Sequence, residues 1–348
     1  MSLMRRGEGG GSSSGSSAST LLLLLHGGSE FDESGLRATV SFQPLPPFCF
    51  DWTGRVAVWF VSRILWLTRI GLADHERGKT IYPGDLDDPR ALLFLRHLEM
   101  SFEPAFWRQM TFAERTGFRV SLSVAHLGRT SWVIRGHLET GLHPAPLMAF
   151  VSQMVYVDAE SRRPAPLPDW FRETHRHLGG SPSPGLPRPY DAGGAGRPAN
   201  PFRYEVTPGT SSLDASRHVH QGEHVRFCAD ALAAGLAAAE EGGRGGGGGR
   251  GSGGGHGGGE GHGGGEGHGG GGGGEGVGAG AWSTARLEKL SVIFAGEAFA
   301  GDSLLVESWV EAERPRCVLF EVSKGGRPLV HSAWTFGDGG PRASRAKL

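Results

Sequence analysis

The sequence predicts an α+β protein whose two halves share one order of elements, each half being a long helix wrapped by an antiparallel sheet. Three observations support this prediction. In the first half an acidic turn is followed by an apolar helical segment and then by strand-like runs. The second half repeats that order after a stretch rich in proline and glycine. Repetition on this scale indicates two similar units, which we expect to pair with each other.

The first helix is expected to follow the turn at residues 51–56 and to run to about Ile70. A membrane-spanning helix needs about 20 mostly apolar residues, and this segment is shorter and carries Arg63 and Arg69. Its apolar residues recur at helical spacing, so a buried helix is expected. Trp59 and Trp66 widen the apolar surface, which predicts cover on more than one side. The residues at helical spacing are Val56, Phe60, Ile64 and Leu67.

Strand signals are clearest at residues 118–124, where Val120, Leu122 and Val124 alternate with small or polar residues. This period of two is typical of a strand with one buried face. Similar runs, joined by short turns, predict an antiparallel series in each half. The strand-like series begins at Leu98 in the first half and at Leu287 in the second, and its further runs lie at residues 131–138, 148–157, 303–310, 317–322 and 329–336. The second helix is expected at 225–241.

Changes in composition divide the chain. We expect a low-complexity, disordered leader at 1–37, because its apolar core of five leucines is shorter than the roughly 7–15 residues of a secretory signal. An organelle address is the alternative for the leader, and the compartment stays open. The remaining expected divisions are a first domain at 38–172, a linker at 173–202, a second domain at 203–337 with a glycine-rich insertion at 242–280, and a tail at 338–348.

The bulk composition excludes some function classes. A net charge of −1 over 348 residues gives no electrostatic reason to expect a nucleic acid or an anionic membrane as partner. The cysteines, at positions 49, 228 and 317, are too far apart to suggest a disulfide framework or a thiolate metal site. Histidines and glutamates of the glycine insertion have side chains that bind zinc or nickel. A polyglycine chain loses much entropy when it organises ligands, so we predict a flexible loop and no metal site.

The turn that opens the second half contains Asp214, His218 and Val219 at a spacing that resembles a known pattern. Hot-dog fold thioesterases of the 4-hydroxybenzoyl-CoA and acyl-ACP type show an Asp-x-x-Gly-His-Val-Asn-Asn turn before their central helix. This chain has Arg217 at the glycine position. His220 and Gln221 stand at the two asparagine positions, so the match is partial.

Two further segments resemble the same family. The first half matches its turn through Asp51, Gly54 and Val56, with Arg55 in place of histidine and Ala57 in place of the first asparagine. Residues 294–302 look like the family's aromatic-x-x-Glu-x-x-x-Gly-Asp segment, with Glu297 as the acid and Glu103 as a weaker counterpart in the first half. The likeness covers residues 38–172 and 203–337 and implies a tandem hot-dog fold whose halves form a pseudo-dimer.

The resemblance implies hydrolysis of an acyl-CoA or acyl-ACP thioester, with no metal or redox cofactor. Asp214 would attack the thioester or activate water, and His218 would orient the substrate or the water. Backbone amides near Arg217 and His218 would polarise the carbonyl oxygen. Asp51 would be the equivalent acid of the first half. The residues expected to contact substrate are Gly54, Arg55, Arg217, His220, Gln221 and Glu297, and those expected to line an apolar slot for the acyl chain are Phe60, Ile64 and Phe227.

Other interpretations remain open at this point. Asp51 and Asp214 are also placed to cap their helices, and Glu297 is also explained as a solvated strand charge. The departures at Arg55, Ala57 and His220 leave a second function possible, an acyl-thioester binding or scaffold protein without turnover. A hot-dog hydratase is a third possibility, although the Asp-x-Asn-Pro-x-His pattern of those enzymes is absent. Further self-association of the pseudo-dimer stays open.

Overall fold

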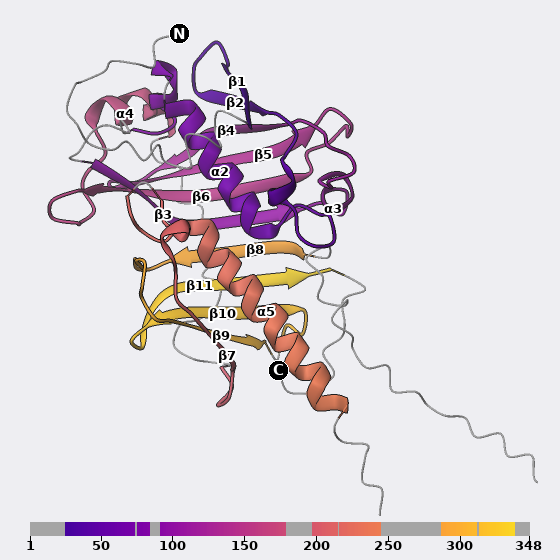
Figure 1. The fold of residues 1–348 in the computed structure, drawn as a ribbon. Helices are drawn as coiled ribbons and strands as arrows, with labels where there is room; N and C mark the ends of the chain where they lie inside the picture. The colour runs from indigo at the N-terminus through magenta and orange to yellow at the C-terminus, as the bar shows by residue number, and fades with distance from the viewer. Residues whose placement is uncertain are drawn as a thin grey trace, which may run out of the picture.

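Eleven antiparallel strands form one continuous sheet, and two long helices lie side by side across one of its faces (Figure 1). The computed structural model describes residues 25–73, 75–83, 91–178, 197–214, 216–244, 287–311 and 313–337. Within this part of the chain the strand order is β1-β2-β4-β5-β6-β3-β8-β11-β10-β9-β7. The predicted α+β class with one long helix per half is therefore confirmed.

The first half supplies six strands and the helix that they wrap. The strands are β1 (His26–Phe31), β2 (Arg37–Phe42), β3 (Ala91–Phe102), β4 (Phe118–Leu127), β5 (Ser131–Thr140) and β6 (Met148–Asp158). The long helix is α2 (Val58–Ala73), and the short helices are η1 (Pro47–Cys49), η2 (Glu76–Thr80), α3 (Phe106–Gln109), α4 (Asp169–Thr174) and η3 (Arg176–Leu178).

The second half repeats this plan with fewer additions. Its long helix is α5 (Gln221–Arg244), preceded by the short η4 (Thr210–Ser212). Its strands are β7 (Phe202–Val206), β8 (Leu287–Phe294), β9 (Leu304–Val310), β10 (Cys317–Lys324) and β11 (Arg327–Phe336).

The halves join edge to edge through β3 and β8, whose register pairs residues 97–101 with 289–293. Side chains reinforce this seam: the ring of His97 lies 3.0 Å from the hydroxyl of Ser291, and Lys289 forms an ion pair with Glu99 at 3.0 Å. Each strand would be an exposed edge in an isolated half, and pairing satisfies the free backbone groups of both. The two sheets expected from the sequence are thus one sheet, which places parts of both halves beside each other along the seam.

Helix α2 is buried as its sequence predicts. Val56, Phe60, Ile64 and Leu67 are all at most 1% exposed, because the sheet covers one side of the helix and α5 covers another. At the contact between the helices, Glu223 of α5 accepts a hydrogen bond from Arg63 of α2. The buried apolar side chains of α2 and α5 stabilise the packing of both helices on the sheet.

Three strands lie outside the predicted ones. β1 and β2 form a hairpin that extends the first half, and β7 pairs with β9 at the other end of the sheet. The leader expected at 1–37 is wrong for residues 25–37, which belong to the folded first half. Residues 1–24, the insertion beyond residue 244 and the tail from 338 lie outside the described residues.

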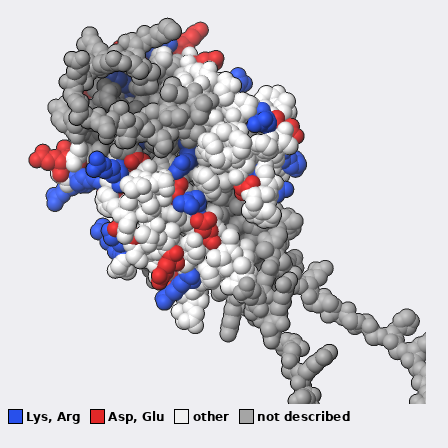
Figure 2. All heavy atoms as spheres, viewed as in Figure 1, with Lys and Arg blue, Asp and Glu red and all other residues white. Residues whose placement is uncertain are grey.

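The described surface carries both charge signs. On the face shown in Figure 2, lysine and arginine side chains are interspersed with aspartate and glutamate. No helix in the described ranges is long and apolar enough to span a membrane.

Candidate active site

The Asp214 carboxylate sits in a tight loop just before α5. Its Oδ1 atom accepts hydrogen bonds from the backbone amides of Ser216, at 2.8 Å, and His218, at 3.2 Å. The backbone closes the same loop, since the amide of Asp214 donates to the carbonyl of His218 at 2.8 Å. Arg217 takes a left-handed φ of 63°, which glycine adopts without strain and arginine does not. The loop therefore holds the carboxylate rigidly, at the expense of local strain.

A second loop, between β8 and β9, brings Glu297 to this turn. The amide of Val219 donates to the carbonyl of Ala298 at 2.8 Å and so fastens the two loops together. The amides of Ala295 and Gly296 both donate to the carbonyl of Leu329, which anchors the start of the second loop on β11. As a result, Oε1 of Glu297 lies 3.7 Å from Nδ1 of His218.

His218 lies between aromatic rings at the seam. Phe94 of β3 stacks on its ring at a centroid distance of 6.1 Å, and Phe299 meets it edge-on at 5.2 Å. The side chain of His218 is only 13% exposed. These rings restrict the imidazole to one orientation, with one nitrogen directed at Glu297.

Arg162 reaches the second-half site from the first half. It follows β6, and its Nη2 atom donates to both carboxylate oxygens of Glu297, at 2.5 and 2.7 Å. The same atom lies 3.2 Å from Nε2 of His218. An arginine can only donate, so Nε2 of His218 must be the acceptor and the proton of a neutral ring must sit on Nδ1, facing Glu297. The sequence analysis did not identify Arg162, because only the fold brings it to this loop.

A second arginine of the first half lies close enough to Asp214 to act on its charge. Burial raises the pKa of Asp214 above its ordinary value, and the His218 amide and Arg69 of α2 offset part of this effect. Arg69 is itself partly buried, and this burial lowers the pKa of its guanidinium, which donates to the carbonyl of Leu93 at 3.3 Å. A carboxylate with a raised pKa is a stronger base than an exposed one.

The backbone amides of Arg217 and His218, expected to bind the carbonyl oxygen of the thioester, have hydrogen-bond partners within their own loop. The amide of Arg217 donates to the carbonyl of Asp214 at 3.0 Å, and the amide of His218 donates to the Asp214 side chain. Both amides are therefore occupied within the loop, and the expectation that they polarise a thioester is wrong. Gln221 opens α5, at the positive end of the helix dipole. The amides of Gly222, Glu223 and His224 donate to Nδ1 or to the carbonyl oxygen of His220, whereas the amide of Gln221 has no acceptor among the described residues.

Three of the expected contact residues have distinct surroundings. His220 is only 4% exposed and packs edge-on against Trp66, and burial lowers its pKa to about 3, so it stays neutral. Arg217 is exposed on the loop, whereas Gln221 lines a cavity beneath α2. Of these three, Gln221 has the position best suited to a bound substrate.

The first-half candidates are not brought to this site. Asp51, Gly54 and Arg55 form the corresponding loop before α2, next to residues 110–112. The amide of Val56 donates to the carbonyl of Met110, as that of Val219 does to Ala298. By this correspondence the counterpart of Glu297 is Gln109 rather than Glu103.

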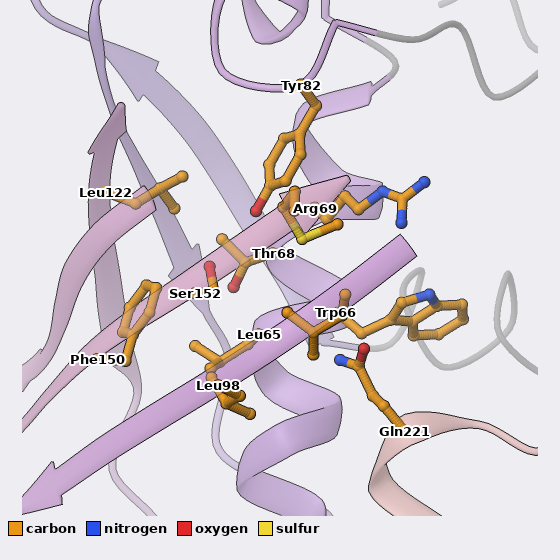
Figure 3. A pocket seen from close by; sticks show the side chains of 12 residues that line it. Leu65, Trp66, Thr68, Arg69, Tyr82, Leu98, Leu122, Phe150, Ser152 and Gln221 are labelled. Carbon is orange, nitrogen blue, oxygen red and sulfur yellow. The ribbon is translucent and has the colours of Figure 1, made fainter. Parts of the chain in front are cut away.

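Two cavities lie near the seam. An outer groove of about 990 Å³ runs from Arg162 and Glu297 over Phe299 toward Lys324 and Arg327. A small inner cavity of about 30 Å³ lies between α2 and the sheet, with Gln221 and Arg69 among its lining residues (Figure 3). Leu95 lines both. In the described residues no group of three histidine, cysteine, aspartate or glutamate side chains could hold a metal ion. The histidines of the glycine insertion lie outside those residues.

Comparison with solved structures identifies the architecture. An acyl-ACP thioesterase from Bacteroides thetaiotaomicron superposes with a TM-score of 0.57, covering 88% of this chain and 100% of that one at 15% identity. The chain has a tandem hot-dog fold. The 12:0-ACP thioesterase from Umbellularia californica matches with a TM-score of 0.57 at 10% identity, over 87% of this chain and 97% of its own.

A putative oleoyl thioesterase from Lactobacillus plantarum is similar to the same extent. Its TM-score is 0.58 at 10% identity, and the match covers 86% of this chain and 96% of that protein. No family model and no curated protein sequence matches the chain. At these identities the likeness establishes the tandem hot-dog architecture, and the chemistry has to be argued from the side chains.

Phe60, Ile64 and Phe227, which the sequence suggested as lining for an acyl slot, are at most 1% exposed and pack in the core. They do not line either cavity described above. The neighbouring α2 residues Leu65 and Trp66 line the inner cavity instead.

Proposed function

We propose that this protein hydrolyses acyl thioesters of CoA or of an acyl carrier protein at the second-half site. The observation that carries the proposal is a half-buried carboxylate, with a pKa raised by burial, beside a histidine that faces a second carboxylate. Glu297 lines the outer groove, and Arg69, whose charge acts on Asp214, lines the inner cavity.

The two cavities suit the two sides of a thioester. The outer groove is long and is bordered by Arg96, Arg162, Lys324 and Arg327, cations that suit the phosphate of a phosphopantetheine arm. The inner cavity is mainly apolar and suits the acyl side. The scissile carbonyl then lies between them, beside Asp214 and the first turn of α5.

In the proposed reaction Asp214 takes a proton from a water molecule whose oxygen bonds to the carbonyl carbon. The amide of Gln221 at the start of α5 stabilises the negative charge on the carbonyl oxygen. The carbon–sulfur bond then breaks, and the thiolate leaves and takes the proton from Asp214. The Nδ1 proton of His218 faces Glu297, so His218 and Arg162 together fix this carboxylate, which accepts a hydrogen bond from the same water and orients it.

The test measures release of free thiol from a panel of acyl-CoA and acyl-carrier-protein substrates by the full chain. Asp214→Asn keeps the acceptor oxygen for the loop amides and removes the base, so we expect a loss of about 100-fold or more in kcat/KM. Asp51→Asn is the matched control and should retain activity. Absence of thiol release by the folded wild type from every substrate would overturn the proposal in favour of a binding protein without turnover.

A further inference from the structure

The inner cavity is small, and its size bears on which acyl groups can enter. Its volume is about 30 Å³, and on the same measure one water-sized group needs roughly 10–15 Å³. The cavity therefore holds about two or three such groups. The outer groove, at about 990 Å³, has no such restriction.

Large side chains from three strands, β3, β4 and β6, and from α2 line the cavity. Phe150 and Met154 of β6 are 5% and 4% exposed, and Leu122 of β4 is 2% exposed. The ring of Phe150 lies against Gly136, where a Cβ atom would approach the ring to 2.4 Å. Gly136 thus leaves the space that the ring of Phe150 occupies, and Phe150 is close-packed where it lines the cavity.

Tyr82 closes the remaining side and is itself held in place. The indole of Trp132 donates to the carbonyl of Ile81 at 3.0 Å, and this bond fixes the backbone next to Tyr82. Figure 3 shows the ring of Tyr82 extending over Thr68 and Ser152, with its hydroxyl group on the cavity side. Burial raises the pKa of Tyr82 to about 12, so the phenol stays neutral.

From this geometry we infer that the protein selects short acyl groups, of about four carbons or fewer, with Phe150, Met154 and Tyr82 as the residues that set the limit. The inference rests on the proposed function, since it assigns the acyl side of the thioester to the inner cavity. With the carbonyl carbon at the Gln221 end of the cavity, two or three further carbons fill the space. A longer chain would have to displace close-packed core side chains.

The experiment compares kcat/KM for saturated acyl-CoAs from two to sixteen carbons, using the full chain. We expect butyryl-CoA to exceed octanoyl-CoA by about tenfold or more, since a pocket discriminates about that strongly for groups that do not fit. Phe150→Ala and Met154→Ala should raise the ratio of octanoyl to butyryl activity. Phe320→Ala is the matched control, because Phe320 is fully buried in the second half and does not line the cavity. It should leave that ratio unchanged.

A binding measurement separates this inference from the catalytic proposal. Non-hydrolysable thioether analogues of butyryl-CoA and dodecanoyl-CoA are titrated against the wild type and Phe150→Ala. Tighter binding of the four-carbon analogue by the wild type, reversed or equalised in Phe150→Ala, supports the inference even if hydrolysis is absent. Fast hydrolysis or tighter binding of the twelve-carbon compounds by the wild type would overturn it while leaving a thioesterase in place. Equal binding of both analogues by both proteins would also overturn it.

Discussion

The loops that begin at Asp51 and Asp214 have nearly the same backbone and very different surroundings. In each, one carboxylate oxygen accepts two backbone amides of its own loop, from Thr53 and Arg55 in the first and from Ser216 and His218 in the second. In both halves the acidic residue thus stabilises the loop before the helix. This structural role alone does not make a catalytic site, because the reactivity of the carboxylate depends on the groups around it.

The differences lie in what the rest of the fold brings to each loop. The second loop has His218 where the first has Arg55, and Glu297 where the first has Gln109. Along the helices, Arg69 of α2 occupies the position that Leu232 occupies on α5, since Ala57 and His220 make equivalent loop hydrogen bonds. The positions of His218, Glu297 and Arg69 correspond to Arg55, Gln109 and Leu232 around the first loop, so the two carboxylates have different neighbours.

The largest effect expected from this comparison concerns Glu297. Glu297→Gln removes the charge that pairs with Arg162 and faces His218, so kcat/KM should fall about 10- to 100-fold. The reciprocal variant Gln109→Glu, at the same place in the first half, should leave thiol release within about twofold of the wild type. Equal losses in both variants would show that the two loops contribute alike.

Removal of Arg162 should have the next largest effect. In Arg162→Ala the Glu297 carboxylate and the His218 ring lose the donor that fixes them, so kcat should fall about tenfold with little change in KM. Arg163→Ala changes the net charge equally at the next position and is the control. A loss of the same size in Arg163→Ala would point to general electrostatics rather than to positioning.

Substitutions at the two loop positions with a left-handed backbone should change the free energy of unfolding and leave the rate of thiol release unchanged. Arg217, with φ of 63°, stands where the first loop has Gly54, with φ of 77°. Arg217→Gly should raise the free energy of unfolding by about 1 kcal/mol, and Gly54→Ala should lower it by a similar amount. Nothing lies within 4 Å of a Cβ atom at Gly54, so the penalty there is conformational. Denaturant unfolding of both variants measures the two changes, and opposite signs are required.

The smallest effect concerns the pH dependence of stability. Because burial raises the pKa of Asp214, the folded protein holds this proton more tightly than the unfolded chain. Its contribution to the free energy of unfolding therefore falls as the pH rises from about 3.9, the ordinary aspartate value, through the raised pKa. Asp214→Asn should melt slightly higher than the wild type at pH 7, by about 1–2 °C, and the gain should vanish below pH 4. A lower melting temperature for Asp214→Asn at pH 7 would contradict this.

Much of the fold was accessible from the sequence because it depends on local patterns. The period of two along residues 118–124 and the helical spacing of Phe60, Ile64 and Leu67 each depend on residues close together in the chain. The hairpin of β1 and β2 was missed because β1 was assigned to a low-complexity leader, while β2 fell at the start of the expected first domain, where no strand was predicted. β7 was missed because its short sequence adjoins the linker, and its pairing with β9 lies about 100 residues away in the chain.

Within the candidate site, the sequence determined the parts that lie on one local segment. The turn from Asp214 to His218 and the acid at Glu297 were recognised by spacing within their own loops. Arg217, at the position where the resembled pattern has glycine, was also recognised from the sequence, because this difference concerns a single position.

Only the tertiary structure brings residues of the first half to the Asp214 loop of the second half. Arg162, Arg69 and Phe94 belong to the first half and reach the Asp214 loop because β3 pairs with β8 and α2 packs on α5. Pairing of distant strands is not encoded at any fixed spacing, so no pattern in the sequence marks these residues. The sequence thus specified two similar loops, and the asymmetric packing around them made the environment of Asp214 different from that of Asp51.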